Sequence, residues 1–275
     1  MLRRTVCPAL ALLLAAVLTA MTVATADGSN PPPGTDAGPP YTFATELKGA
    51  GSVGVGLKDA AWLTRSEHGY RLRSGQQDSH LVVTLLDGRL RFADTGTKSF
   101  KRLSPACHRK KVRVGIVAVC RVPGSISVRR PLLVEVWPRL GNDFTDTSTL
   151  PATFAVTVLA DKGHDVARFG AGRDFFNGFS GRDLVRGGGG NDWIRAGLGN
   201  DAVHGRAGND DIVAVDGRDT LHGGGGDDRL WAGDGDDRLW GDAGADFVLC
   251  GAGRDSANVD AGDRVFQNCE SVHHG

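Results

Sequence analysis

Apolar residues recur at every ninth position through the second half of the chain. The spacing holds without insertion for Ala167, Phe176, Val185, Ile194, Val203, Ile212, Leu221, Leu230, Leu239, Val248 and Ala257. Because alternate side chains of a strand face opposite ways, one apolar residue per unit indicates a strand of about three residues with one inward side chain. A single unit cannot bury that side chain, whereas stacked units share a continuous core. The pattern therefore predicts an all-β solenoid.

Two further columns share this period and define the rest of the unit. When the apolar residue is numbered as place eight, place four is Gly and place six is Asp. Place four holds Gly163, Gly172, Gly181, Gly190, Gly199, Gly208, Gly217, Gly226, Gly235, Gly244, Gly253 and Gly262. Place six holds Asp165, Asp174, Asp183, Asp192, Asp201, Asp210, Asp219, Asp228, Asp237, Asp246 and Asp255. Glycine adopts positive φ and permits close backbone approach, so places one to six are predicted to form a turn.

The aspartate column carries the candidate chemistry. Asn or Asp also recurs beside it at place five, in Asn191, Asn200, Asn209, Asp227 and Asp236. Stacked strands lie ~4.8 Å apart, so an uncompensated ladder of carboxylates would repel itself. Carboxylate and carbonyl oxygens in a glycine-rich turn suit Ca²⁺, which takes about six to eight oxygen ligands. The alternative is that each Asp only caps its turn by accepting backbone hydrogen bonds, in a metal-free solenoid.

The unit Gly-Gly-x-Gly-x-Asp-x-apolar-x resembles the haemolysin-type (RTX) calcium-binding nonapeptide. The units that begin at Gly187 and Gly223 match it fully, while those at Ala196, Ala232 and Cys250 differ at place one. Over residues 163–258 the layout resembles secreted calcium-binding repeat proteins of high-GC bacteria. The resemblance implies a parallel β-roll in which two units form one coil, with Ca²⁺ between turns two units apart.

The resemblance also implies a ligand set in two rows. One row holds Asp192, Asp210, Asp228 and Asp246, and the other holds Asp183, Asp201, Asp219, Asp237 and Asp255. Backbone carbonyls of the glycine turns complete each shell, at Gly188, Gly190, Gly197, Gly199, Gly224, Gly226, Gly233 and Gly235. Arg occupies place five at Arg173, Arg182, Arg218 and Arg254. A cation there should weaken ion binding, so the strongest sites are expected at 187–237.

The N-terminus predicts export from the cell. Arg3 and Arg4 precede an apolar run at 9–20, and Ala24-Thr25-Ala26 fits a cleavage site, so residues 1–26 are predicted to be a signal peptide. The Pro- and Gly-rich residues 27–40 predict an extended linker. Four cysteines then remain, and the pairs that close the shortest loops are Cys107–Cys120 and Cys250–Cys269. A four-cysteine zinc site would need a C-x-x-C knuckle, which the sequence lacks.

Residues 41–130 lack the nonapeptide and predict an irregular β-rich N-terminal region. Two apolar runs, 81–86 and 89–92, flank Asp87-Gly88, which is typical of a hairpin with a two-residue turn. Alternation over 112–119 predicts another strand, and 132–137 is similar to a first, divergent coil. We therefore expect the roll at 131–258. Residues 259–275 should form a cap that the Cys250–Cys269 bridge holds over the last coil.

Charge and motifs narrow the function classes. Residues 1–160 hold 20 Lys and Arg against 11 Asp and Glu, while residues 161–275 hold 12 against 21. The zero net charge gives no argument for a nucleic-acid partner. The chain has no H-E-x-x-H, and its lone G-x-G-x-x-G at 49–54 lacks a βαβ context. We expect a secreted, non-enzymatic calcium-binding protein with no membrane span after signal cleavage.

The alternative function is a binding module. In a metal-free solenoid, the place-nine residues would stack on the outer faces, with Val213, Trp231 and Leu249 on one face and His222 with Trp240 on the other. Exposed aromatic residues on a flat sheet can bind a cell-envelope glycan or a protein.

Overall fold

The computed structural model describes residues 59–66, 68–75, 78–266 and 268–275. This part of the chain contains strands, turns and loops and no helix, which confirms the all-β expectation. Consequently, the described residues contain no helix long and apolar enough to cross a membrane. The predicted signal peptide 1–26 and linker 27–40 lie outside the described residues.

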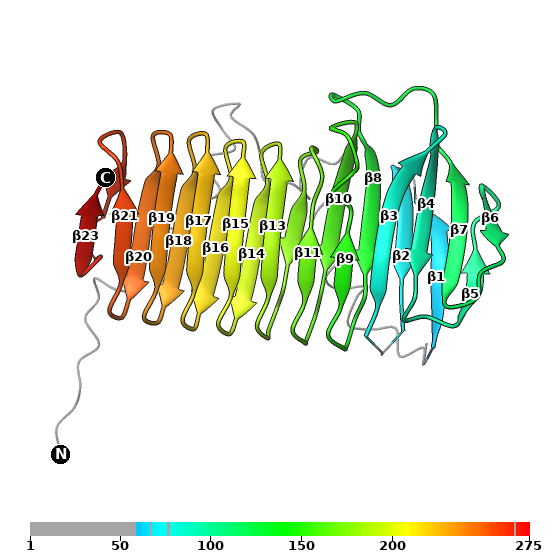
Figure 1. The fold of residues 1–275 in the computed structure, drawn as a ribbon, viewed down its shortest axis with the longest axis horizontal. Coiled ribbons are helices and arrows are strands. Elements are labelled where there is room, and N and C mark those ends of the chain that lie inside the picture. Colours follow the sequence, from blue (N-terminus) through cyan, green and yellow to red (C-terminus); the bar gives the residue numbers. More distant parts are fainter. Residues whose placement is uncertain (1–58, 67, 76–77, 267) are drawn as a thin grey trace, which may run out of the picture.

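Two sheets run the length of the molecule (Figure 1). Sheet A has the order β22 (Arg264–Val265), β20 (Phe247–Ala252), β18 (Arg229–Asp234), β16 (Asp211–Asp216), β14 (Trp193–Leu198), β12 (Phe175–Asn177), β10 (Phe154–Leu159), β8 (Leu132–Trp137), β2 (Gly69–Arg73), β1 (Ala60–Arg65) and β5 (Ser99–Leu103). Sheet B has the order β23 (Ser271–His274), β21 (Ser256–Val259), β19 (Arg238–Ala243), β17 (Thr220–Gly225), β15 (Ala202–Ala207), β13 (Leu184–Gly189), β11 (Val166–Arg168), β9 (Phe144–Asp146), β3 (His80–Leu86), β4 (Arg89–Asp94), β7 (Ile116–Arg121) and β6 (Cys107–Lys110).

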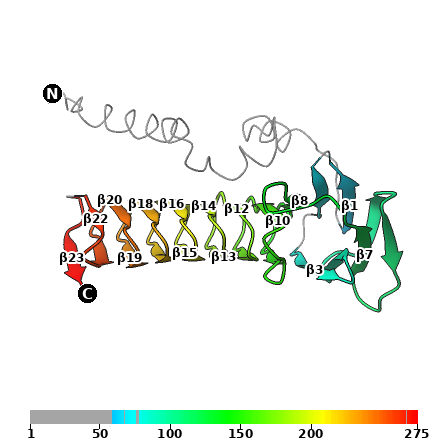
Figure 2. The same ribbon diagram turned by 90° about the horizontal axis from the view of Figure 1, so that it is seen from above.

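Two nonapeptides form one coil of the solenoid. Successive strands alternate between the sheets, and each pairs in parallel with the strand two places along the chain. Leu221 pairs with Val203 in sheet B, and Leu230 pairs with Ile212 in sheet A. Figure 2 shows the two sheets facing each other along the stack, joined by the turns. The expected parallel roll with a repeat of two units is therefore confirmed.

Each nonapeptide has two inward positions, whereas the sequence analysis predicted one. The place-eight side chains are buried, as expected, and Val203, Ile212 and Leu221 have no exposed area. Place one also faces inward, where Ala196 and Ala214 are fully buried in sheet A. The prediction of a three-residue strand was thus wrong. The strands of regular coils have six residues, because pairing resumes at places two and three after an interruption at place one.

In the regular coils the backbone has positive φ at places two and four, which explains the glycines there. Gly190 and Gly226 at place four have φ of 101° and 125°. At place two the chain tolerates other residues in the same conformation, including Arg206 at 85° and Val215 at 140°. A β-branched side chain in this region is strained.

Replacing Val215 by Gly should therefore stabilise the solenoid. Relief of backbone strain outweighs the greater chain entropy of Gly, so we expect the free energy of unfolding to rise by about 1 kcal/mol. Urea unfolding at fixed Ca²⁺ measures this. The matched control is Val213→Gly, two residues earlier in β16 without positive φ. It should lower stability, and a loss in both variants would contradict the strain at Val215.

At its N-terminal end the solenoid changes from parallel to mainly antiparallel pairing. β3 and β4 form the predicted hairpin around Asp87-Gly88, with Leu86 opposite Arg89. The strand predicted at 112–119 begins only at Ile116. Val114 is 64% exposed, and Gly115 has a φ of 74°, so the chain turns before it joins the sheet. The core is nonetheless continuous from these strands into the coils.

Both predicted disulfides are present. Cys107–Cys120 joins directly opposed residues of β6 and β7. Cys250–Cys269 connects the buried face of β20 with the segment before β23. The second bridge links the C-terminal tail to β20.

Candidate metal-binding turns

The place-six aspartates form two rows, one along each edge of the stack. The first edge holds Asp174, Asp192, Asp210, Asp228 and Asp246, and the second edge holds Asp165, Asp183, Asp201, Asp219, Asp237 and Asp255. All are at most 2% exposed. In each row the members are 18 residues apart, so the expected division into two rows is observed.

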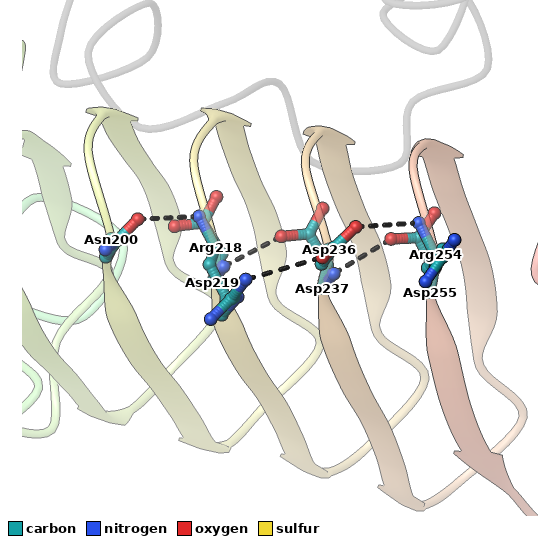
Figure 3. Close-up of polar contacts among 7 residues, drawn as sticks. All are labelled: Asn200, Arg218, Asp219, Asp236, Asp237, Arg254 and Asp255. Carbon is teal, nitrogen blue, oxygen red and sulfur yellow. Dashed lines mark hydrogen bonds and ion pairs between the residues drawn. The ribbon is translucent and has the colours of Figure 1, made fainter.

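Each aspartate uses one carboxylate oxygen to connect adjacent coils. The backbone N–H of Asp210 donates to Oδ1 of Asp228 at 2.7 Å, and that of Asp219 donates to Oδ1 of Asp237 at 2.7 Å. Figure 3 shows this ladder on the second edge, from Asp219 through Asp237 to Asp255. Each aspartate therefore accepts a hydrogen bond from the coil that precedes it in the sequence. The metal-free alternative expected these aspartates to accept N–H groups of their own turn, whereas the donor belongs to the neighbouring coil.

The other carboxylate oxygen is buried without a hydrogen-bond partner. This holds among the described residues for Oδ2 of Asp143, Asp165, Asp174, Asp183, Asp192, Asp201, Asp210, Asp219, Asp228, Asp237, Asp246 and Asp255. A buried polar atom without a partner costs about 1–3 kcal/mol, and more when it is charged. Each of these buried oxygens therefore needs a bound proton or a cation to compensate for the missing hydrogen bond.

Burial makes the charged form of these carboxyls unfavourable. The pKa of Asp183 and of Asp228 is raised from 3.8 to about 8, mainly by desolvation and in smaller part by the neighbouring aspartates of the same row. The pKa of Asp219 rises to about 7 for the same reasons. Desolvation also raises the pKa of Asp192, with Asp174 and Asp210 adding to the effect. The rows can thus hold full negative charge near neutral pH only if positive charge compensates them.

Main-chain carbonyls lie beside the orphaned oxygens on the first edge. An ideal Cβ on Gly187 would lie 2.6 Å from Oδ2 of Asp192 and 2.5 Å from the carbonyl oxygen of Gly205. On Gly223 it would lie 2.5 Å from Oδ2 of Asp228 and 2.6 Å from the carbonyl oxygen of Gly241. A carboxylate oxygen and a carbonyl oxygen therefore converge over Gly187, Gly205 and Gly223, whereas carboxylate oxygens of Asp246 and Asp263 converge over Gly241.

Place one differs between the two edges. On the first edge it is Gly187, Gly205, Gly223 and Gly241, and on the second edge it is Gly178, Ala196, Ala214, Ala232 and Cys250. At Gly187, Gly205 and Gly223 a methyl group would overlap the two oxygens, and Gly178 on the second edge is crowded in the same way by Asp183 Oδ2 and the Ala196 carbonyl. The other second-edge positions, Ala196, Ala214 and Ala232, bury a methyl group in the core.

Gly223→Ala should accordingly be much more harmful than Ala214→Gly. The first change forces a methyl group against Oδ2 of Asp228 and a backbone carbonyl, at a cost of about 3 kcal/mol. The second removes a methyl group and adds backbone freedom, at a cost of about 1 kcal/mol. Denaturant unfolding with and without Ca²⁺ would compare them. Equal losses would show that the two edges have the same packing.

Place five forms an outer ladder of its own. Oδ1 of Asn200 accepts the N–H of Arg218 at 2.8 Å, and Oδ1 of Asp236 accepts the N–H of Arg254 at 3.2 Å (Figure 3). The Arg218 guanidinium lies 3.4 Å from Asp236 Oδ2, and both side chains are largely exposed. The Asn and Asp side chains at this place thus stabilise the stack, and this arginine pairs at the surface.

Three residues at the ends of the rows were not predicted. Oδ1 of Asp263 accepts the N–H of Asp246 at 2.9 Å, and Oε2 of Glu270 accepts that of Asp255 at 2.7 Å. At the other end, Oδ1 of Asp143 accepts the N–H of Ser79 at 2.6 Å. Asp263 lies one position before place six and Glu270 lies outside the nonapeptide pattern, so the period gave no signal for either. For Asp143 a signal was present, because Gly141, Asn142 and Asp143 match places four to six of the nonapeptide.

No cluster of three or more His, Cys, Asp or Glu side chains suited to a metal occurs in the described ranges. A cation in these turns therefore needs backbone carbonyls as well as carboxylates. The predicted glycine ligands lie in these turns, and place two and place four have positive φ at Gly188, Gly190, Gly197, Gly199, Gly224, Gly226, Gly233 and Gly235. Buried carboxylate and carbonyl oxygens without nitrogen or sulfur donors fit a hard cation such as Ca²⁺.

Comparison with known families supports the same interpretation of the repeats. Residues 177–212 and 213–248 each match the family described as RTX calcium-binding nonapeptide repeat (4 copies). These matches cover most of the regular coils and leave the residues before 177 and after 248 outside. No curated protein and no solved structure matches the chain.

Proposed function

We propose that the RTX nonapeptide repeats of this chain bind several Ca²⁺ ions between successive coils, and that this binding couples folding of the roll to extracellular calcium. The observation that carries the proposal is the buried, unpartnered Oδ2 of every place-six aspartate in the regular coils. These oxygens lie in a water-poor turn that a proton or a cation must neutralise.

The donor set favours Ca²⁺ over other cations. Ca²⁺ accepts about six to eight oxygens in flexible geometry, whereas Mg²⁺ prefers to keep several waters. The ligands that we propose are the carboxylates of the two rows and the carbonyls of the glycine turns. When bound, the ion supplies positive charge to the buried carboxylates and holds neighbouring turns together.

Coupled folding follows from mass action. An ion that binds the folded roll and not the unfolded chain stabilises the roll according to its concentration above the dissociation constant. The predicted signal peptide and the two disulfides are consistent with a secreted, extracellular protein. We infer that the roll is loose at low intracellular calcium and folds after export. This function requires no catalytic residue.

A calcium titration of the full chain without its predicted signal peptide tests the proposal. We expect chelator to remove β-structure in the far-ultraviolet circular dichroism spectrum, and Ca²⁺ to restore it. Mg²⁺ at equal concentration is the matched control and should have little effect. Isothermal titration would count the ions. An unchanged, fully folded spectrum and melting temperature in excess chelator would contradict calcium-coupled folding.

A stacked ring ladder favours the second candidate function, a binding face. On sheet B, the rings of His204 and His222 stack at 4.8 Å, and those of His222 and Trp240 at 4.4 Å. All three are partly exposed. Flat stacked rings suit the faces of sugar rings in a glycan. Trp240→Ala should abolish retention on an immobilised glycan if this face binds one, without changing calcium affinity.

A further inference from the structure

Arginine and tryptophan alternate across the outer face of sheet A at its N-terminal end. Trp62 in β1 lies opposite Arg102 of β5 on one side and opposite Arg73 of β2 on the other. Arg73 in turn lies opposite Trp137 of β8. Its guanidinium carbon lies 4.2 Å from the centroid of the Trp137 ring. Four adjacent strands therefore place aromatic rings and guanidinium groups side by side.

This face contains a pocket of about 480 Å³. Its lining includes Trp62 and four arginines, Arg65, Arg71, Arg73 and Arg102. The volume is within the range of about 300–1,000 Å³ that is typical of small-molecule sites. A pocket with four guanidinium groups and a partly exposed tryptophan combines strong positive charge with a flat apolar surface.

The positive charge of the pocket is only partly neutralised. Arg71 pairs at 2.7 Å with the buried Glu135, and its guanidinium also lies over Trp137. Within the described ranges, the side chains of Arg65 and Arg102 form no ion pair or hydrogen bond. The surrounding sequence is also basic, since residues 59–130 hold 15 Lys and Arg against 5 Asp and Glu.

We propose that this pocket binds an anionic saccharide, through guanidinium contacts to its carboxylate or phosphate group and stacking of a sugar ring on Trp62. Arg65 and Arg102 would bind the anion, because guanidinium matches carboxylate and phosphate oxygens in paired, charge-assisted hydrogen bonds. Arg71 and Arg73 are positioned by Glu135 and Trp137, so the basic wall is ordered before a ligand arrives.

The tryptophan selects a sugar over a simple anion. The indole face offers a platform for the apolar face of a pyranose, while Arg65 at the end of the same strand and Arg102 on the neighbouring β5 bind the charged substituent. This site is separate from the calcium turns, since it lies on β1, β2 and β5 at the opposite end of the stack from the last coils (Figure 1).

Isothermal titration of the calcium-loaded chain without its predicted signal peptide tests the site. The probes are trigalacturonate, glucose 6-phosphate, neutral maltotriose and inorganic phosphate at equal ionic strength. We expect one or both anionic sugars to bind, the neutral sugar not to bind, and phosphate to bind at least tenfold more weakly. Comparing the two anionic sugars distinguishes a carboxylate from a phosphate ligand.

Variants make the assignment specific. Arg102→Gln and Arg65→Gln should each weaken binding of the anionic sugar about tenfold. Trp62→Ala should remove the preference for sugar over inorganic phosphate. Arg129→Gln is the matched control, because Arg129 is an exposed arginine outside the pocket and its loss changes net charge equally. Melting curves confirm that each variant is folded.

Two outcomes would overturn the proposal. One is that neither anionic sugar binds at millimolar concentration. The other is that Arg129→Gln weakens binding as much as Arg102→Gln, which would indicate nonspecific attraction to the basic end of the molecule.

Discussion

Asp228→Asn should stabilise the roll in chelator at pH 9 and weaken it in Ca²⁺. Asn keeps the Oδ1 acceptor that receives the N–H of Asp210 at 2.7 Å. It replaces the orphaned Oδ2 by an NH₂ group, which can donate a hydrogen bond; the nearest acceptor on the same side of Gly223 is the carbonyl oxygen of Gly241. Removing a buried, unpaired charge should raise the free energy of unfolding by about 1–3 kcal/mol without metal. With metal, losing a carboxylate ligand should lower calcium affinity at the adjacent sites at least tenfold.

The two oxygens of the carboxylate can be tested apart with two further variants. Asp228→Ala loses both the ladder acceptor and the ligand, so it should be destabilised in chelator and in Ca²⁺ alike. Asp234→Asn is the matched control, since it makes the same change of charge at an exposed place-three residue of β18. Urea unfolding in chelator and in Ca²⁺ measures the stability of all three variants. If Asp228→Asn and Asp234→Asn behave alike, Asp228 does not hold a cation.

Without Ca²⁺, stability should fall as pH rises from about 4 to about 8. The pKa of Asp183 is raised from 3.8 to about 8, so between these values the folded chain retains a proton that the unfolded chain has lost. One such group loses about 4 kcal/mol of stability over this interval, which corresponds to about 10 °C in melting temperature for a chain of this size. Asp228 and Asp143, whose pKa values are also raised to about 8, act in the same direction.

With Ca²⁺, the pH dependence should reverse. Protons and Ca²⁺ compete for the same buried oxygens, so the stabilisation by 10 mM Ca²⁺ should grow as pH rises from 5 to 8. Scanning calorimetry at a series of pH values, with chelator or with Ca²⁺, measures both trends. A melting temperature in chelator that rises over this range would show that positive charge already compensates the carboxyls in the metal-free chain.

The repeat itself could be predicted because each column reports a local physical requirement. Gly163 and its equivalents indicated positive φ, and the apolar column indicated the core. The two rows followed from the resemblance to the nonapeptide family, and the two disulfides followed from loop lengths. The signal for the second core row was also present, since place one alternates between Gly and Ala from Gly187 to Ala232. Place-one residues that are 18 positions apart are identical in type, with Gly at 187, 205 and 223 and Ala at 196, 214 and 232. This alternation distinguishes the two edges of the stack.

The remaining features depend on contacts between residues far apart in the chain. The pocket wall combines Trp62, Arg73 and Arg102 because β1 pairs with β2 on one side and with β5 on the other. Neither a sequence period nor a short motif predicts that these three residues lie side by side. The terminal acceptors Asp263 and Glu270 are similar, because the tail leaves the nonapeptide register before it reaches the turns that it completes.

The direction of the carboxylate ladder gives the solenoid a polarity. Each coil completes the turn of the coil before it, so every coil presents a backbone donor that only later sequence can satisfy. Asp263 and Glu270 end this dependence, which makes the C-terminal tail a terminator for both rows. Whole coils of 18 residues are therefore interchangeable modules ahead of one fixed terminator. The length of such a molecule can change by duplication or loss of a coil without any new chemistry at either end.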